Sequence, residues 1–388
     1  MKKVCLLLFL FFIHITLTAC GTKQESVSSK PPEEKPPAYG DILVRGDIGD
    51  ASNLIPILAS DSASHNIAGM IYNGLVKYDK NMNIVGDLAE SWDISSNGLV
   101  ITFHLRKGIK WHDGKPFTSA DVLYTYQATI DPKTPTAYAG DFLKVKKVEA
   151  PDDYTFRATY EKPFAPALIS WSSAILPRHL LAGKDITQSS LSRHPIGTGP
   201  YMFREWVAGQ KIVLVSNPDY FEGQPYIDGR MTRIIPDTAT MFLELRAQNI
   251  GMMGLTPLQY TRQTENNLFK NNFNKYRYLS FAYTFMGYNL KNPLFADKRV
   301  RQAISYAINK DEIISGVLLK LGKPANGPYK PGTWAFNDKV KVYNYNPQKA
   351  LALLNEAGWK KTGSEGLLKK DGQPFIFEIV TNQGNETR

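Results

Sequence analysis

Both cysteines of this chain, Cys5 and Cys20, lie within its first twenty residues. The rest of the sequence therefore has neither the thiols for a disulfide scaffold nor the thiolates for a cysteine-ligated zinc site. It must fold around a hydrophobic core, and its composition allows this, because 43% of the 388 residues are hydrophobic and 21% are charged. At roughly 100–200 residues per domain, a chain of this length has room for two or three domains.

The chain is basic, with 46 Lys and Arg residues against 36 Asp and Glu residues. Such an excess can favour nucleic acid or an anionic membrane surface. The charges are scattered, however, and the sequence has no block of roughly five or six like charges. We therefore expect a solvated basic surface and no nucleic-acid partner.

The N-terminus has the pattern of an export signal. Lys2 and Lys3 precede an apolar run from Val4 to about Leu17, which is shorter than the roughly twenty residues of a membrane span. The run ends in Leu17-Thr18-Ala19-Cys20, which resembles the lipobox of bacterial lipoproteins, where the cysteine is acylated and becomes the first mature residue. This predicts a signal peptide over residues 1–19 and lipidation of Cys20, for example by palmitate.

The segment after Cys20 is rich in proline and serine and almost lacks large apolar side chains. Such a stretch buries too little surface to offset the entropy of ordering it. We expect residues 20–40 to be the lipidated cysteine and a flexible tether. The predicted location is thus the periplasmic or cell-surface side of a membrane, with the protein held there by its lipid.

Beyond the tether, strand and helix patterns alternate. Residues 99–106 alternate apolar and polar side chains, which predicts a half-buried strand between turns at Asn97-Gly98 and Asp113-Gly114. Thr118 opens a helix with a capping-box pattern. Residues 297–314 show an apolar helical stripe, and Asn346-Pro347 begins a further helix that Gly358 ends. An α/β fold follows.

The histidines give no reason to expect catalysis or metal binding. His65, His104, His112, His179 and His194 form no HExxH or HxH motif, and we expect structural or solvated roles for them. The sequence also lacks the G-x-S-x-G elbow of serine hydrolases. We expect no enzyme, no metal site and no cofactor, although a lipoprotein surface hydrolase stays open as an alternative.

One glycine-rich stretch, Gly197-Thr198-Gly199-Pro200, superficially suggests a phosphate-binding loop. Its proline removes a backbone N–H where a phosphate would need one. The segment therefore predicts a tight crossing of two chain segments.

Several blocks together resemble the family 5 extracellular solute-binding proteins, the peptide- and nickel-binding components of ABC transporters. The blocks are long, and they follow one another in the order and spacing of that family. They are Ile71–Val76, Leu88–Trp92, Thr102–Gly114, Thr118–Val122, Ile196–Tyr201 and Asp297–Lys310.

The resemblance implies a two-lobed clamp of the periplasmic-binding-protein type, in the enlarged peptide-binding variety. It implies lobe I over residues 41–280, with an inserted subdomain at about residues 60–185, and the start of lobe II over residues 281–388. It further implies a monomer that captures di- or oligopeptides by lobe closure and delivers them to permease and ATPase subunits. Nickel or another small solute is the alternative ligand on the same fold.

The same resemblance gives tentative ligand-binding residues. Tyr138 lies where the family places a ligand-facing aromatic side chain. The segment from Tyr283 to Asn289 looks like a strand that enters the second lobe and borders the cleft, with Phe285 and Gly287 between these ends.

Two features depart from the family. An acidic pair that family members usually have around Gly251 is absent here, because the chain reads Gln248-Asn249-Ile250-Gly251-Met252. Family members also usually extend beyond 388 residues, so we expect the second lobe to be incomplete after an apparent strand, Phe375 to Thr381. The acidic residue with which peptide-binding members hold the ligand's amino group belongs to that further part, so none is assigned here.

Overall fold

The computed structural model describes residues 36–333, 335–361 and 366–381. The predicted signal peptide, Cys20 and most of the predicted tether lie outside these residues. The unit considered below is residues 39–388. Within its described part, no helix is both long enough and apolar enough to cross a bilayer.

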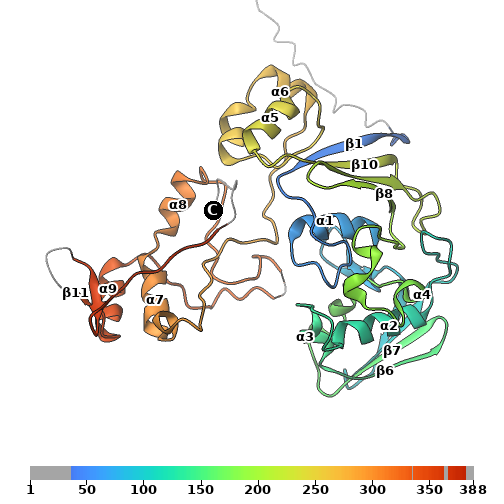
Figure 1. Ribbon diagram of the computed structural model, residues 1–388, viewed down its shortest axis with the longest axis horizontal. Coiled ribbons are helices and arrows are strands. Elements are labelled where there is room, and N and C mark those ends of the chain that lie inside the picture. The colour runs from blue at the N-terminus through green and yellow to red at the C-terminus, as the bar shows by residue number, and fades with distance from the viewer. Residues whose placement is uncertain (1–35, 334, 362–365, 382–388) are drawn as a thin grey trace, which may run out of the picture. The chain divides into compact units, whose positions relative to one another are not determined.

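One four-stranded sheet has the strand order β1-β10-β9-β8 (Figure 1). β1 runs parallel to β10, whereas the β10–β9 and β9–β8 pairs are antiparallel. Because β1 is far from β10 in sequence, the chain leaves this sheet after β1 and returns to it. The strands are β1 (Gly40–Asp47), β8 (Tyr201–Val207), β9 (Lys211–Ser216) and β10 (Ile227–Ile234).

The intervening residues form a second, antiparallel sheet with the order β4-β5-β7-β6. Its β5 strand is the one that the alternation predicted, and Ile101, Phe103 and Leu105 are buried while the residues between them are half-buried. Gly98 has a φ of +69° in the turn before β5, as the Asn-Gly pair predicted. The strands are β4 (Ala89–Ile94), β5 (Val100–Leu105), β6 (Val145–Asp152) and β7 (Thr155–Tyr160).

Helix α2 (Ser119–Ile130) begins at the predicted capping box and packs against β6 and β7. The Asp121 carboxylate accepts a hydrogen bond from the backbone N–H of Thr118 at 2.9 Å. Between helix and sheet, Trp171 is buried with Phe103, Phe142 and Phe156 at ring distances of 5.8, 5.1 and 4.9 Å. This aromatic cluster is part of the largest hydrophobic core.

Shorter elements connect and flank the two sheets. Helix α5 packs on β1 through Met241, in a second core with Phe242, Leu245 and Ile250. The elements are α1 (Ser62–Ile71), β2 (Val76–Tyr78), β3 (Ile84–Gly86), α3 (Ala139–Phe142), η1 (Ile169–Ser172), α4 (Arg178–Leu181), η2 (Ile186–Gln188), η3 (Ser190–Ser192), α5 (Thr238–Arg246), η4 (Gln259–Gln263) and α6 (Asn267–Asn272).

The glycine-rich stretch at residues 197–200 is a tight crossing, as predicted. The Gly199 N–H donates to the Ile71 carbonyl at 2.7 Å, at the end of α1. A Cβ atom on either Gly197 or Gly199 would lie 2.6 Å from the Ile71 carbonyl carbon. Two chain segments therefore meet here at a distance that only glycine allows.

Residues 290–381 form their own small cores around α7 and α9, which pack together. Asn346 caps α9 and Gly358 follows it with a φ of +92°, both as predicted. The strands β12 and β13 form a hairpin around Asp371-Gly372. The elements are η5 (Pro293–Phe295), α7 (Lys298–Ala307), α8 (Lys310–Gly316), α9 (Pro347–Glu356), β11 (Lys360–Lys361), β12 (Leu368–Lys370) and β13 (Gln373–Pro374).

Three predictions about the chain from residue 283 onward were wrong. The helical stripe at residues 297–314 is two helices, because Ile308 is extended and the Asn309 side chain caps α8. Residues 375–381 and 283–289 belong to no strand. Both segments have strand-like composition. Phe375 donates to the Leu368 carbonyl of β12 at 2.8 Å, but in the described part of the chain no ladder of hydrogen bonds continues beyond it, and residues 283–289 have no neighbouring strand.

Candidate functional site

The candidate site begins at the N-terminus of α1. Asp61 caps this helix and accepts hydrogen bonds from the Ser64 N–H at 2.7 Å and from the Ser52 hydroxyl at 2.5 Å. Partial burial acts in the opposite direction, but these hydrogen bonds hold the pKa of the Asp61 carboxyl below its usual value. The capped first turn fixes the position of His65.

His65 and Tyr138 meet above the chain segment that precedes α1. The Tyr138 hydroxyl lies 3.0 Å from the Ala59 carbonyl oxygen and 2.7 Å from His65 Nε2, and the two rings are edge to face at 5.6 Å. The phenol donates to the Ala59 carbonyl oxygen, so the partner of its oxygen is an N–H on His65 Nε2, which also lies 3.1 Å from the same carbonyl oxygen. Both polar tips are thereby occupied.

This arrangement presents Tyr138 as a fixed aromatic surface. Tyr138 is the residue immediately before α3, and this place in the chain positions its side chain. The residue is 39% exposed. A ring held by two hydrogen bonds loses little conformational entropy when a ligand packs on it. The chemistry available is therefore contact and hydrogen bonding.

The other predicted residues form a separate group. The rings of Tyr283 and Phe285 lie 5.4 Å apart, and both are exposed. Gly287 lies beside them, since a Cβ atom there would be 3.4 Å from the Phe285 ring. Within the described residues, no contact joins this group to Tyr138.

Asn289 has a local structural role. Its side-chain oxygen accepts from the Lys291 N–H at 3.1 Å, and its carbonyl accepts from the Asn292 N–H at 3.0 Å. These bonds form the turn that leads into η5. The Asn289 side chain thus stabilises this turn.

The block Ile71–Val76 contains a buried polar network. Asn73 Nδ2 donates to both oxygens of Asp87, and Thr198 donates to Asn73. Lys77 lies 3.4 Å from Asp87 and 2.5 Å from Glu222. Burial raises the pKa of the Asp87 carboxyl, although Lys77 and Asn73 act against it. This network joins distant segments of the first core.

The remaining histidines also contact neighbouring groups, and His194 packs edge to face against Phe203 at a ring distance of 5.6 Å. His112 Nδ1 accepts from the Gly197 N–H at 3.2 Å and its Nε2 donates to the Gly199 carbonyl at 3.0 Å. His179 lies 2.7 Å from Asp113, and His104 lies 2.8 Å from Asp93. Over the residues that the structure describes, no group of three or more His, Cys, Asp or Glu side chains could hold a metal ion.

The sequence did not indicate that Ala59 and His65 belong with Tyr138. Ala59 contributes only its carbonyl group, which no sequence pattern marks. His65 could have been found from the helix start, because it follows the Asp61 cap by one turn and must lie on the same side as the capping residues.

The sequence of this chain is similar to those of known proteins. Residues 83–388 match the family described as bacterial extracellular solute-binding proteins, family 5 Middle. The chain belongs to this family. Members of this family are solute-binding proteins that act outside the cytoplasm. The two-lobed α/β clamp predicted from the sequence is the fold of this family, so that prediction is confirmed.

Among family 5 relatives, the oligopeptide-binding protein AppA of Bacillus subtilis is 36% identical over 398 aligned positions, covering 100% of this chain and 72% of AppA. The structure of AppA with a nonapeptide matches with a TM-score of 0.82 at 35% identity, covering 91% of this chain and 71% of AppA.

Two other solved structures are similar. NikZ of Campylobacter jejuni in complex with Ni(L-His) matches with a TM-score of 0.78 at 31% identity, covering 86% of this chain and 66% of NikZ. DppA of Helicobacter pylori in complex with the peptide STSA matches with a TM-score of 0.73 at 32% identity, covering 83% and 67%. The chain thus spans about two thirds of the length of these relatives.

Proposed function

We propose that this protein is the substrate-binding component of an ABC transporter and captures di- or oligopeptides outside the cytoplasm. The observation that carries the proposal is the similarity to AppA in complex with a nonapeptide, together with an exposed aromatic ring that this fold holds rigidly at Tyr138. Peptides of varied sequence are bound through their backbone and through roomy side-chain pockets. Tyr138, Tyr283, Phe285, Gly287 and Asn289 are the proposed ligand-binding residues.

Capture by closure requires two lobes. We assign lobe I to residues 41–280, with an inserted subdomain at about residues 60–185, and the start of lobe II to residues 281–388. The exposed Tyr283 and Phe285 then supply aromatic surface from the second lobe, while Tyr138 supplies it from the first. The proposed monomer releases its peptide to permease and ATPase subunits, and it binds the peptide without hydrolysing it.

Peptide titration tests this proposal. The chain has 6 tryptophans and 20 tyrosines as fluorescence reporters. We expect saturable quenching or enhancement with short peptides, and recovery of the peptides intact. Tyr138→Ala should weaken binding roughly tenfold, as loss of an aromatic anchor does at binding sites. Tyr78→Ala is the matched control, because Tyr78 is also 39% exposed but lies on β2.

A nickel complex is the second candidate ligand, and the NikZ structure with Ni(L-His) favours it. The same titration with nickel plus L-histidine separates the two candidates. Saturation by this mixture, with no response to any peptide, would replace peptide by a metal complex.

The location of the protein is proposed from its N-terminus. We propose that residues 1–19 are removed as a signal peptide and that Cys20 is lipidated and anchors the protein to a membrane. Mass spectrometry of the membrane-extracted protein should show acyl chains on Cys20. Cys20→Ala should release the protein from the membrane fraction, and Cys5→Ala should have no effect on anchoring.

A further inference from the structure

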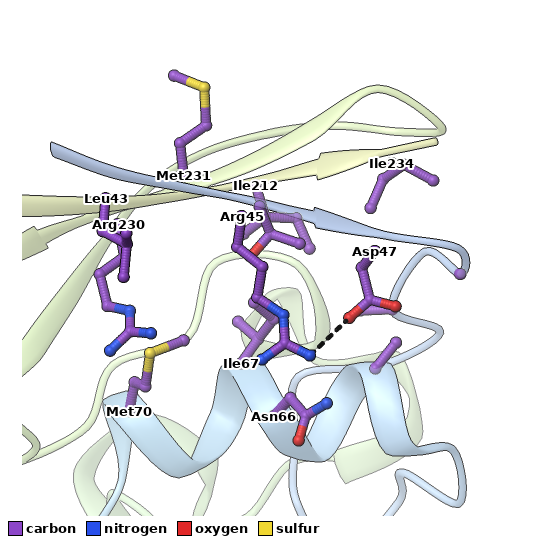
Figure 2. A pocket seen from close by; sticks show the side chains of 14 residues that line it. Leu43, Arg45, Asp47, Asn66, Ile67, Met70, Ile212, Arg230, Met231 and Ile234 are labelled. Atoms are coloured by element: carbon purple, nitrogen blue, oxygen red, sulfur yellow. Dashed lines mark ion pairs between the residues drawn. The ribbon is translucent and has the colours of Figure 1, made fainter. Parts of the chain in front are cut away.

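A pocket of about 200 Å³ lies between the β1-β10-β9 part of the first sheet and helix α1 (Figure 2). Figure 2 shows Arg45 and Arg230 extending from the sheet toward the helix, with Asn66, Ile67 and Met70 opposite them on α1. None of the residues proposed above to bind peptide lines this pocket. Its lining combines charge with apolar surface, so it is suited to an amphipathic ligand.

Strand register places the charged residues together. In the parallel β1–β10 pair, Arg45 is opposite Thr232 and Leu43 is opposite Arg230. Side chains at paired positions share one face of a sheet, and so do those two residues apart along a strand. Arg45, Asp47 and Arg230 therefore all project from the face that is turned to α1.

The positive charge of the pocket is only partly compensated. Arg45 Nη2 lies 3.6 Å from Asp47 Oδ2, and in the described part of the chain Arg45 Nε is buried without a hydrogen-bond partner. Arg230 lies over the Tyr201 ring at 5.8 Å and has no salt bridge with any described residue. Two guanidinium groups thus face one carboxylate, which leaves an excess of one positive charge.

Apart from Asn66 and Thr232, the rest of the lining is apolar, with Ile67, Met70 and Ile212 beside the arginines. At ~30 Å³ of liquid volume per water molecule, the pocket has the volume of about seven waters. Guanidinium groups bind carboxylates through two parallel N–H···O bonds. The single excess charge matches a monoanion, whereas a phosphate at neutral pH carries more charge.

We propose that this pocket is a binding site for a carboxylate group with a short apolar substituent. Arg230 holds the carboxylate, Arg45 Nε donates a further hydrogen bond, and Ile67, Met70 and Ile212 contact the substituent. The carboxylate belongs either to a free small acid or to a bound peptide, and the experiment below distinguishes these sources.

Calorimetric titration with butyrate at low ionic strength tests the proposal directly, with neutral butyramide as the matched ligand. We expect butyrate to bind and butyramide not to bind. Arg230→Gln should weaken butyrate binding roughly tenfold or more, as expected for loss of a charge-assisted pair. Arg204→Gln is the control, because Arg204 is an exposed arginine on β8 outside the pocket.

The Asp47→Asn substitution should change the affinity for butyrate in the direction opposite to Arg230→Gln. It removes the carboxylate that competes for Arg45, so butyrate should bind more tightly to this variant than to the wild type. An arginine that only supports the sheet would not produce this gain. Thermal unfolding of each variant checks that the sheet remains folded.

A second arm uses a nonapeptide with a free C-terminal carboxylate and its amidated counterpart. If the peptide supplies the carboxylate, the wild type should bind the amide roughly tenfold more weakly, and Arg230→Gln should remove this preference. The proposal is overturned if neither butyrate binding nor the preference for the free carboxylate depends on Arg230, or if inorganic phosphate binds more tightly than butyrate. Peptide binding that persists in that case leaves the proposed function intact.

Discussion

At the scale of single residues, the crossing at Gly197 depends on the absence of one carbon atom. Gly197→Ala would place a Cβ against the backbone of Ile71, which no side-chain rotation can relieve. We expect a loss of about 1–3 kcal/mol in the free energy of unfolding, typical of overpacking. Gly69→Ala, in α1 with open space around it, should instead stabilise the protein by roughly 0.5–1 kcal/mol. Urea unfolding of both variants measures this, and equal effects would contradict the close approach.

A second prediction at this scale concerns pH. The pKa of the Asp87 carboxyl is raised by burial, with Lys77, Glu222 and Tyr220 around it. Such a group favours folding below its unfolded pKa of 3.8, and this contribution is lost as the pH rises through the raised pKa. The unfolding free energy of the wild type, relative to that of Asp87→Asn, should therefore fall as the pH rises above 3.8.

The partly exposed Asp79 is the control for Asp87. Hydrogen bonds from Asn83 lower its pKa, so its contribution is present above 3.8 and is lost as the pH falls. The unfolding free energy of the wild type, relative to that of Asp79→Asn, should therefore rise with pH, opposite to the trend for Asp87. Parallel trends for the two variants would show that the Asp87 carboxyl is not destabilised by its burial.

At the scale of elements, the Asp121 carboxylate stabilises the start of α2 through two hydrogen bonds. Asp121 accepts from the Thr118 N–H at 2.9 Å and from the Arg178 N–H at 3.0 Å, so it joins α2 to the start of α4. Asp121→Ala leaves two N–H groups without acceptors and should cost about 2–4 kcal/mol, more than one cap. Asp237→Ala removes only the exposed cap of α5 and should cost about 1 kcal/mol. Chemical denaturation measures the loss in unfolding free energy for both variants. Equal losses would contradict a stabilising role for the hydrogen bond between Arg178 and Asp121.

Elements specified by local chemistry were predicted from the sequence. β5, α2 and α9 have their signals within the segment itself, as alternation, a capping box and an Asn-Pro start. The strands predicted at residues 283–289 and 375–381 were wrong, because a strand also needs a neighbouring strand, and alternation within a segment does not show whether there is one. At the candidate site, resemblance supplied Tyr138, whereas the Ala59 carbonyl and the register that joins Arg45 to Arg230 depend on tertiary structure.

At the scale of the whole molecule, the hydrophobic cores differ greatly in extent. The first core includes both sheets and buries Trp111 and Trp171, whereas the cores around α7 and α9 contain few buried residues. Local opening is easiest where backbone hydrogen bonds and buried contacts are few. The exposed aromatics of residues 276–290 lie in such a segment, which has no ladder of strand hydrogen bonds in the structure.

Hydrogen exchange followed by mass spectrometry links this difference to function. Without ligand, amides of β5, β7 and α2 should exchange slowly and those of residues 276–289 quickly, because only the former lie in the large core. If peptide binds as proposed, an added nonapeptide should slow exchange at residues 276–289 and next to Tyr138, since a bound backbone supplies hydrogen-bond partners and excludes water. Protection confined to one of these two regions would contradict capture between two lobes, and unchanged exchange at saturating peptide in both would remove these residues from the binding site.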